Sequence, residues 1–202
     1  MSPKTSKINH ANDLNREEAN ALAKQLENQL QNGDFKSIKE EDIKSMISGL
    51  GNKNGLVRRR FAEELGNIGQ IALPGLLKAL RESNNVTMRR AAAKTIKLVG
   101  DPSALPYLLE ALMKDEDPVV QGSSAGAMAI FGEDAIEYLL EVLGNSESTA
   151  MQSGLASWAL AFAGSNASSR LKKAAKSKKT AIRAAAIAAL GDLIQSLNDD
   201  DN

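Results

Sequence analysis

The sequence contains no cysteine and only one histidine among its 202 residues. A chain without cysteine has no disulfide framework, no thiolate nucleophile and no cysteine metal site, and it suits a reducing compartment. The single histidine, His10, has no second histidine or cysteine with which to complete a metal shell or a catalytic triad. We therefore expect no metal site, and the sequence assigns no catalytic residue.

Aromatic residues are also scarce, at 3%, whereas hydrophobic residues reach 43%. A composition rich in alanine, leucine, lysine and glutamate, with few bulky β-formers, favours helices over extended sheets. Nowhere do about eighteen apolar residues stand together, and Met1 to Asn15 lacks the apolar run of a signal peptide. Because 25 basic and 25 acidic residues cancel, no nucleic-acid partner is indicated. We expect a soluble, intracellular protein without a membrane span.

What the sequence does contain is an internal repeat. An apolar and basic segment closed by glycine, followed at once by a second apolar segment, recurs along the chain. The clear copies read LVRRRFAEELGNIG, VTMRRAAAKTIKLVG, PVVQGSSAGAMAIFG and AMQSGLASWALAFAG, and a fifth, TAIRAAAIAALGDLI, begins near Thr180. The closing glycines stand 31, 32 and 32 residues apart, at Gly69, Gly100, Gly132 and Gly164.

Each copy is long enough for two helices. The glycine stands where the first helix must end, because a residue without Cβ adopts positive φ easily. Pro74 and Pro106 then fall in the first turn of a second helix, where the missing N–H costs nothing. Two amphipathic helices of this length cannot bury their apolar faces alone, so neighbouring copies must stack. The prediction is an all-α protein, an α-α superhelix of HEAT-like repeats with about five helical hairpins.

The repeats also set the expected domain boundaries. Residues 15–197 should form one domain, with an N-terminal cap over 15–55 and the repeats over 56–197. Within the cap, Asn15 to Leu30 has the pattern of an amphipathic helix, and Glu41 to Leu50 that of the second helix of a degenerate repeat. Residues 1–14 lack apolar periodicity and residues 198–202 form an acidic tail, so both ends are predicted to be disordered.

The copies share an apolar-arginine start, as in Val57-Arg58, small residues in mid-helix, and a Gly-Asp or Gly-Glu turn. In these features the segment from Leu56 to Leu197 resembles the HEAT-like repeats of the phycobilin lyase family of E/F type. The runs VVQGSSAGAMAIFGE and GLASWALAFAG are most similar to the lyase subunits and phycobiliprotein chaperones of that family.

The resemblance implies a phycobiliprotein biogenesis factor, a bilin lyase subunit or chaperone that positions an open-chain tetrapyrrole, a phycobiliprotein client, or both. The bilin, phycocyanobilin or phycoerythrobilin, would be a substrate joined to a client cysteine by a thioether, and not a permanently bound cofactor. Implied partners are a phycobiliprotein subunit and a second HEAT-repeat lyase subunit in a heterodimer, in the cyanobacterial cytosol. The alternative is a non-catalytic HEAT-repeat scaffold or adaptor, for example in phycobilisome disassembly.

Alignment of the copies by their glycines indicates a candidate binding surface. The polar stripe of the Gly69 copy is Arg60, Glu63 and Asn67. At the same positions the Gly164 copy carries Leu155, Trp158 and Phe162, extended one turn by Met151, and the Gly132 copy carries Ser123, Gly126 and Ile130. An aromatic ridge beside a floor of small residues fits a partner-binding or ligand-binding surface. The alternative is that this stripe packs in the core.

Arginine recurs at one repeat position, as Arg58, Arg89 and Arg183, where the middle copies carry Gln121 and Ser153. This recurrence favours a structural ladder in which guanidinium groups bridge neighbouring turns through carboxylates such as Asp101 or Asp192. Three arginines outside the pattern are candidates to bind bilin propionates or acidic client residues: Arg59, Arg60 and Arg90.

Every charged residue from Arg170 to Arg183 is basic. This run is either a solvated face or a contact for an anionic partner, in which case the candidate residues are Arg170, Lys172, Lys173 and Lys176. If the protein assists a lyase reaction, proton transfer would fall to a carboxylate, Tyr107 or Tyr138, among which the sequence does not choose.

Overall fold

The structure is a computed structural model, and it describes residues 14–32, 38–163 and 168–199. In these ranges the chain forms α-helices and short 3-10 turns and no strand, which confirms the all-α prediction. The chain divides between Val99 and Gly100 into two compact units, each described by itself below. Residues 1–13 and 200–202, and with them His10 and most of the predicted acidic tail, lie outside the described residues.

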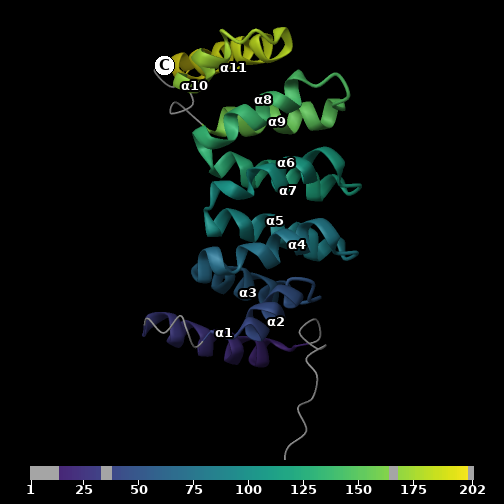
Figure 1. The fold of residues 1–202 in the computed structure, drawn as a ribbon, viewed down its shortest axis with the longest axis vertical. Coiled ribbons are helices and arrows are strands. Elements are labelled where there is room, and N and C mark those ends of the chain that lie inside the picture. Colours follow the sequence, from purple (N-terminus) through teal and green to yellow (C-terminus); the bar gives the residue numbers. More distant parts are fainter. Residues whose placement is uncertain (1–13, 33–37, 164–167, 200–202) are drawn as a thin grey trace, which may run out of the picture. The chain divides into compact units, whose positions relative to one another are not determined.

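The first unit contains five α-helices, all within its described part. They are α1 (Arg16–Gln31), α2 (Glu40–Gly49), α3 (Gly55–Ile68), α4 (Leu73–Glu82) and α5 (Val86–Val99). The first helices of successive hairpins lie side by side, α3 against both α1 and α5, and the second helices α2 and α4 form the other layer (Figure 1). The single-domain boundaries expected from the sequence stay a prediction.

The core of the first unit comes from the apolar stripe that the repeat predicts. On α3, Val57, Phe61 and Leu65 recur every four residues and are all buried, because this spacing places them on one face of a helix. Other fully buried side chains of this unit are Met46, Leu50, Leu76, Leu80 and Ile96.

The second unit repeats this arrangement. Its helices in the described residues are α6 (Leu105–Lys114), α7 (Pro118–Ile130), α8 (Ile136–Gly144), α9 (Ala150–Phe162), α10 (Ser168–Ala174) and α11 (Thr180–Asp199). The first helices α7 and α9 pack together, the second helices α6 and α8 lie behind them, and α11 packs on α8, α9 and α10 (Figure 1). The fifth copy therefore begins at Thr180, where the sequence places it.

Three of the four predicted glycines stand at hairpin turns in the described residues, and Gly164 lies outside them. Gly69, Gly100 and Gly132 have φ values of 70°, 72° and 56°, a region that a side chain makes unfavourable. Pro74 and Pro106 both stand in the first turn of the second helix of a hairpin. The repeat period is thus set by a backbone conformation that glycine adopts at little cost.

The glycine turn predicts a specific loss of stability. At Gly69, φ is 70° and ψ is −134°, so alanine there should cost about 2 kcal/mol of unfolding free energy. Gly154, inside α9 with nothing near its missing Cβ, is the matched control, because alanine there should stabilise the helix by about 1 kcal/mol. Chemical denaturation of both variants measures the difference, and equal stabilities would contradict this reading of the turn.

The recurring arginines form the expected ladder with a different acceptor. Arg58, Arg89 and Arg183 each donate from Nη1 to the backbone carbonyl six residues upstream, over 2.6, 2.9 and 2.8 Å. Gln121 does the same from Nε2, over 2.7 Å to the Asp115 carbonyl. Because a glutamine makes the same bond as the arginines, the shared carbonyl acceptor explains the recurrence. The side chain of Asp192 lies outside the described residues.

Candidate functional site

The candidate site is an exposed apolar face of α9. The helix begins with a capping box, in which Thr149 and Gln152 satisfy each other's backbone N–H groups. Its buried face is built from Ala156, Ala159 and Leu160. The opposite face, which we call the α9 ridge, consists of Met151, Leu155, Trp158 and Phe162.

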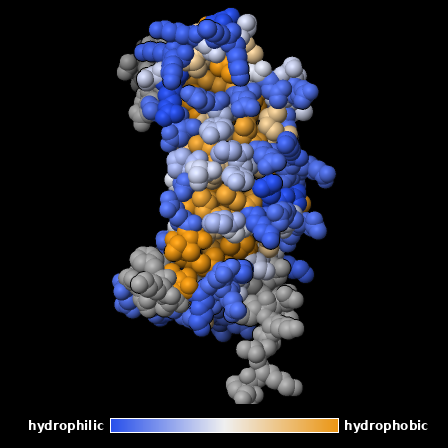
Figure 2. Space-filling model, viewed as in Figure 1, coloured by the Kyte–Doolittle hydropathy of each residue, from blue (hydrophilic) through white to orange (hydrophobic). Residues whose placement is uncertain are grey.

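The ridge is open to solvent although it is apolar. Trp158 is 52% exposed and Phe162 is 58% exposed, and their rings stack with centroids 5.7 Å apart and an interplanar angle of 30°. Met151 is also exposed, and Leu155 is half-buried. On the face drawn in Figure 2, patches of apolar surface lie between hydrophilic side chains. Exposed aromatic clusters of this kind are characteristic of interaction surfaces.

Two glycines of α7 lie against the ridge. A Cβ at Gly126 would stand 3.9 Å from the Trp158 ring, and one at Gly122 would stand 3.8 Å from Leu155 Cδ2. Ile130, at the end of α7, is 53% exposed. One predicted floor residue needs correction: Ser123 is buried, and its hydroxyl donates to the Val119 carbonyl over 2.7 Å, so it presents no polar group to a ligand.

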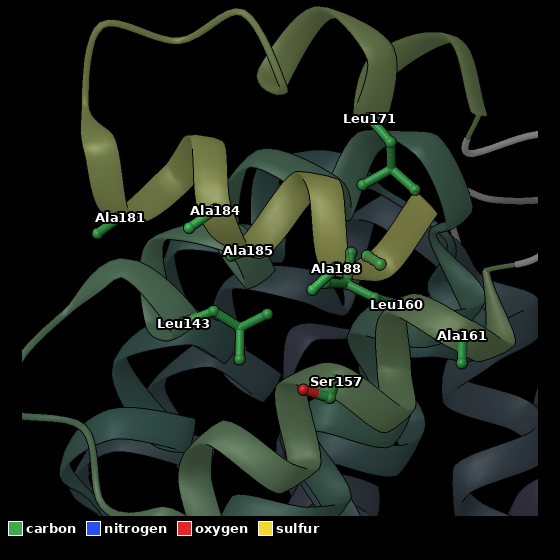
Figure 3. A pocket seen from close by; sticks show the side chains of 10 residues that line it. Leu143, Ser157, Leu160, Ala161, Leu171, Ala181, Ala184, Ala185 and Ala188 are labelled. Atoms are coloured by element: carbon green, nitrogen blue, oxygen red, sulfur yellow. The ribbon is translucent and has the colours of Figure 1, made fainter. Parts of the chain in front are cut away.

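A cavity of about 520 Å³ lies between α9 and α11. Ser157 and Ala161 of α9 line it, and their side chains leave that helix on a different face from the ridge. Its remaining lining is almost entirely aliphatic, with Leu143, Leu160, Leu171 and five alanines of α11, whose small side chains leave the space between the helices open (Figure 3). The sequence analysis did not predict this cavity, although the run of alanines in the fifth copy indicates loose packing there.

The three arginines proposed for propionates have different surroundings. Arg60 is held between Glu27 of α1 and Glu64 of its own helix, at 3.0 Å from each carboxylate. Arg59 pairs with Glu63 at 2.8 Å. Arg90 has no carboxylate partner in the described part of the chain and lines a groove between α3 and α5. All three belong to the first unit and the ridge to the second, so the structure does not assemble them into one described site.

Glu64 is an acidic residue held in the interior of the first unit. Its side chain is only 2% exposed. Burial raises the pKa of its carboxyl above 4.5, and the attraction of Arg60 and a hydrogen bond from Asn67 counteract this only in part. Because Arg60 also holds Glu27, this cluster joins α1 to α3.

The raised pKa of Glu64 predicts the sign of a pH effect. Between pH 4.5 and the folded-state pKa, the folded protein binds more protons than the unfolded chain, so this group makes stability fall as pH rises through that window. Glu64→Gln removes this contribution, and the fall in stability over that window should become shallower. Thermal unfolding across the window tests this, with Glu63→Gln as the exposed control on the same helix; an unchanged slope in Glu64→Gln would contradict the assignment.

The predicted basic run lies on α10 and the turn that follows it. Arg170 is paired with Glu133 at 3.8 Å and with Asp134 at 3.0 Å. Lys172 and Lys176 are exposed. Lys173 lines a separate cavity of about 440 Å³ together with Glu137 and Glu141 of α8. The run therefore borders acidic residues of its own unit, which favours its reading as a solvated face over an anion site.

The described residues contain no cluster of three or more potential metal ligands. Among the same residues, no helix combines the length and apolarity needed to cross a membrane. Tyr107 and Tyr138, the candidates for proton transfer, lie on α6 and α8, in the layer behind α7 and α9, and line none of the three cavities described here. No catalytic residue is assigned.

Helical hairpins that repeat every 31 or 32 residues and turn at a glycine define the chain as a HEAT-repeat protein. The family model for HEAT repeats matches residues 73–157, and that for the PBS lyase HEAT-like repeat matches residues 57–82. Both matches agree with the resemblance found in the sequence, that of HEAT-like repeats of the PBS lyase type.

Two known proteins resemble it along most of its length. The chain is 47% identical over 188 residues to the bilin biosynthesis protein MpeU of Synechococcus sp. (strain WH8020), an alignment that covers 93% of this chain and 63% of that relative. The solved complex of CpcE and CpcF of phycocyanin lyase from Nostoc sp. PCC7120 has a similar fold, with a TM-score of 0.52 and 22% identity over 75% of this chain and 99% of that one. The chain thus spans less than two thirds of the MpeU relative.

Proposed function

We propose that this protein is a phycobiliprotein biogenesis factor, a bilin lyase subunit or chaperone that uses the α9 ridge to hold an open-chain tetrapyrrole. The observation that carries the proposal is the 47% identity to a protein named for bilin biosynthesis, over nearly the whole of this chain. The ridge is the proposed site, since half-exposed aromatic residues can pack on flat, conjugated rings.

The ridge suits a tetrapyrrole for physical reasons. Stacked Trp158 and Phe162 offer a rigid aromatic surface that loses little conformational entropy when a planar ligand covers it. The cavity between α9 and α11, at about 520 Å³, is in the size range of small-molecule sites, and its alanine lining places no charge against an apolar guest.

In a lyase reaction the sulfur nucleophile belongs to the client, so the chain needs no cysteine of its own. Addition of a client thiol to a carbon–carbon double bond of the bilin forms one carbon–sulfur bond and transfers the thiol proton to carbon, without any oxidant. The HEAT repeats would then hold the bilin and the client thiol close together in a reactive orientation. Such positioning alone lowers an activation barrier by about 7 kcal/mol or more in favourable cases.

The proposal includes the partners and location that the sequence indicates. The client is a phycobiliprotein subunit in the cyanobacterial cytosol, and the bilin is phycocyanobilin or phycoerythrobilin. A second HEAT-repeat subunit in a heterodimer is supported by the CpcE–CpcF complex, one chain of which shares this fold.

Co-expression tests the proposal directly. The chain is produced in a host that makes a bilin, with a phycobiliprotein subunit and with or without a second HEAT-repeat subunit, and covalently coloured client is measured by absorbance after denaturing electrophoresis. Adduct yield should rise when the chain is present. A yield that the chain leaves unchanged with every pairing, while it still binds the client without pigment, would favour the scaffold or adaptor role instead.

A further inference from the structure

The helix α5 carries charge of one sign. It contains Arg89, Arg90, Lys94 and Lys97 and no carboxylate, although the whole chain has equal numbers of acidic and basic residues. Elsewhere in the described residues cations are commonly paired within a turn of their own helix, as Lys44 is with Glu40 and Lys78 with Glu82. Arg90, Lys94 and Lys97 make no ion pair with a carboxylate in the described part of the chain.

These three cations share one side of α5, because positions spaced by four and then three residues lie along a single helix face. That side forms one wall of a groove of about 570 Å³ between α5 and α3. The opposite wall adds Arg58 and Arg59, and Glu63, already paired with Arg59, is the only acidic side chain in the lining.

The floor of the groove is apolar. Ala62 of α3 and Ala91 of α5 line it, and Leu98 is 49% exposed at its end. The lining residues of α5 run from Thr87 to Leu98, which is most of the helix and corresponds to about 16 Å along its axis. The groove is therefore a trough with an apolar centre and cationic edges, about three helical turns long.

We propose that the groove between α3 and α5 is a docking site for an acidic amphipathic helix of a partner protein. Leucine-sized side chains on one stripe of that helix would contact Ala62, Ala91 and Leu98, and flanking carboxylates would pair with Arg90, Lys94 and Lys97. Docking of a helix into a groove through anchors three and four residues apart is an established mode of peptide recognition. The inference concerns the first unit and does not rest on the proposed bilin function.

The composition of the groove favours a protein helix over a nucleic acid. The lining has no aromatic side chain on which bases could stack, and its floor consists of alanine and leucine, which a phosphate backbone would leave uncovered. An acidic amphipathic helix matches both the floor and the edges of the groove. Its apolar stripe would cover the floor, and its carboxylates would pair with Arg90, Lys94 and Lys97 at the edge.

The experiment uses the full chain and a fluorescent synthetic probe, a capped peptide of about 15 residues with leucine on one helical stripe and glutamate on both flanks. The control peptides replace each glutamate with lysine, or shuffle the same residues so that the stripe is lost. Binding is followed by fluorescence anisotropy at low and high salt. The patterned acidic peptide should bind, more weakly at high salt, and neither control peptide should match it.

Two charge reversals in the groove, Arg90→Glu and Lys94→Glu, should each weaken this binding about tenfold or more. Lys78→Glu, on α4 outside the groove, is the matched reversal and should change it little. Circular dichroism checks that all three variants keep their helix content. The proposal is overturned if the patterned peptide does not bind, if the shuffled peptide or a single-stranded oligonucleotide binds as tightly, or if Lys78→Glu weakens binding as much as the groove variants.

Discussion

Trp158→Ala should weaken binding of phycocyanobilin or phycoerythrobilin by about 2 kcal/mol, close to thirtyfold in the dissociation constant. The ring is half exposed and stacks on Phe162, so it offers a large preformed contact area that alanine cannot replace. Because the variant keeps the buried face of α9, formed by Ala156, Ala159 and Leu160, it should fold with unchanged helix content. Absorbance titration of the bilin measures the affinity, and circular dichroism measures the helix content.

Leu56→Ala is the matched control for this change. Leu56 is also an exposed apolar side chain, at 54%, but it belongs to α3 of the first unit and is not part of the α9 ridge. Its truncation should leave the affinity for bilin unaltered. If both variants bind bilin like the unmodified protein, the ridge is not the pigment surface; if Trp158→Ala loses its helix content, the ring belongs to the core.

Phe61→Ala should lower stability, whereas Trp158→Ala should lower affinity for bilin. Phe61 is fully buried on the apolar stripe of α3, and removal of a buried phenylalanine ring typically costs about 3–5 kcal/mol of unfolding free energy. A large loss of unfolding free energy is expected in denaturant titration. Binding of bilin should change only under conditions in which the first unit unfolds. A stability close to that of the unmodified protein would show that the stacked-hairpin core is not built as described.

The contrast between these two aromatic residues shows what the sequence could and could not predict. Phe61 lies in a regular four-residue apolar stripe, so its burial follows from helical periodicity. Trp158 lies in a helix that is apolar on nearly every face, and periodicity cannot then say which face a neighbouring helix covers. Only the placement of α7, whose Gly126 lies against the ring, shows that half of the ring stays exposed.

Other differences have equally local causes. The glycine turns were predictable because their positive φ belongs to glycine itself. Alignment with the polar stripe of the Gly69 copy places Ser123 on the open floor, but its side chain is buried and its hydroxyl donates to the carbonyl four residues before it. Arg60 was assigned to a ligand because its partner Glu27, 33 residues away on α1, cannot be identified from repeat spacing.

The role of Gln121 explains an apparent break in the repeat. Its sequence position looks like a lost arginine, yet its amide makes the same bond to a carbonyl six residues upstream that the arginines make. The position requires a donor long enough to reach the end of the preceding helix, and charge is not part of that requirement. Comparison by charge therefore missed the equivalence of Gln121 with the arginines. Comparison by side-chain length and hydrogen-bonding capacity would have predicted its bond to the upstream carbonyl.

Trp158 fluorescence is the most direct test of the account, because this residue is the only tryptophan in the chain and lies in the proposed binding surface. Titration with phycocyanobilin or phycoerythrobilin should quench its emission saturably, with a midpoint that matches the bilin affinity from absorbance. Emission that falls only linearly with pigment, as for free tryptophan in the same solution, would contradict binding at the α9 ridge.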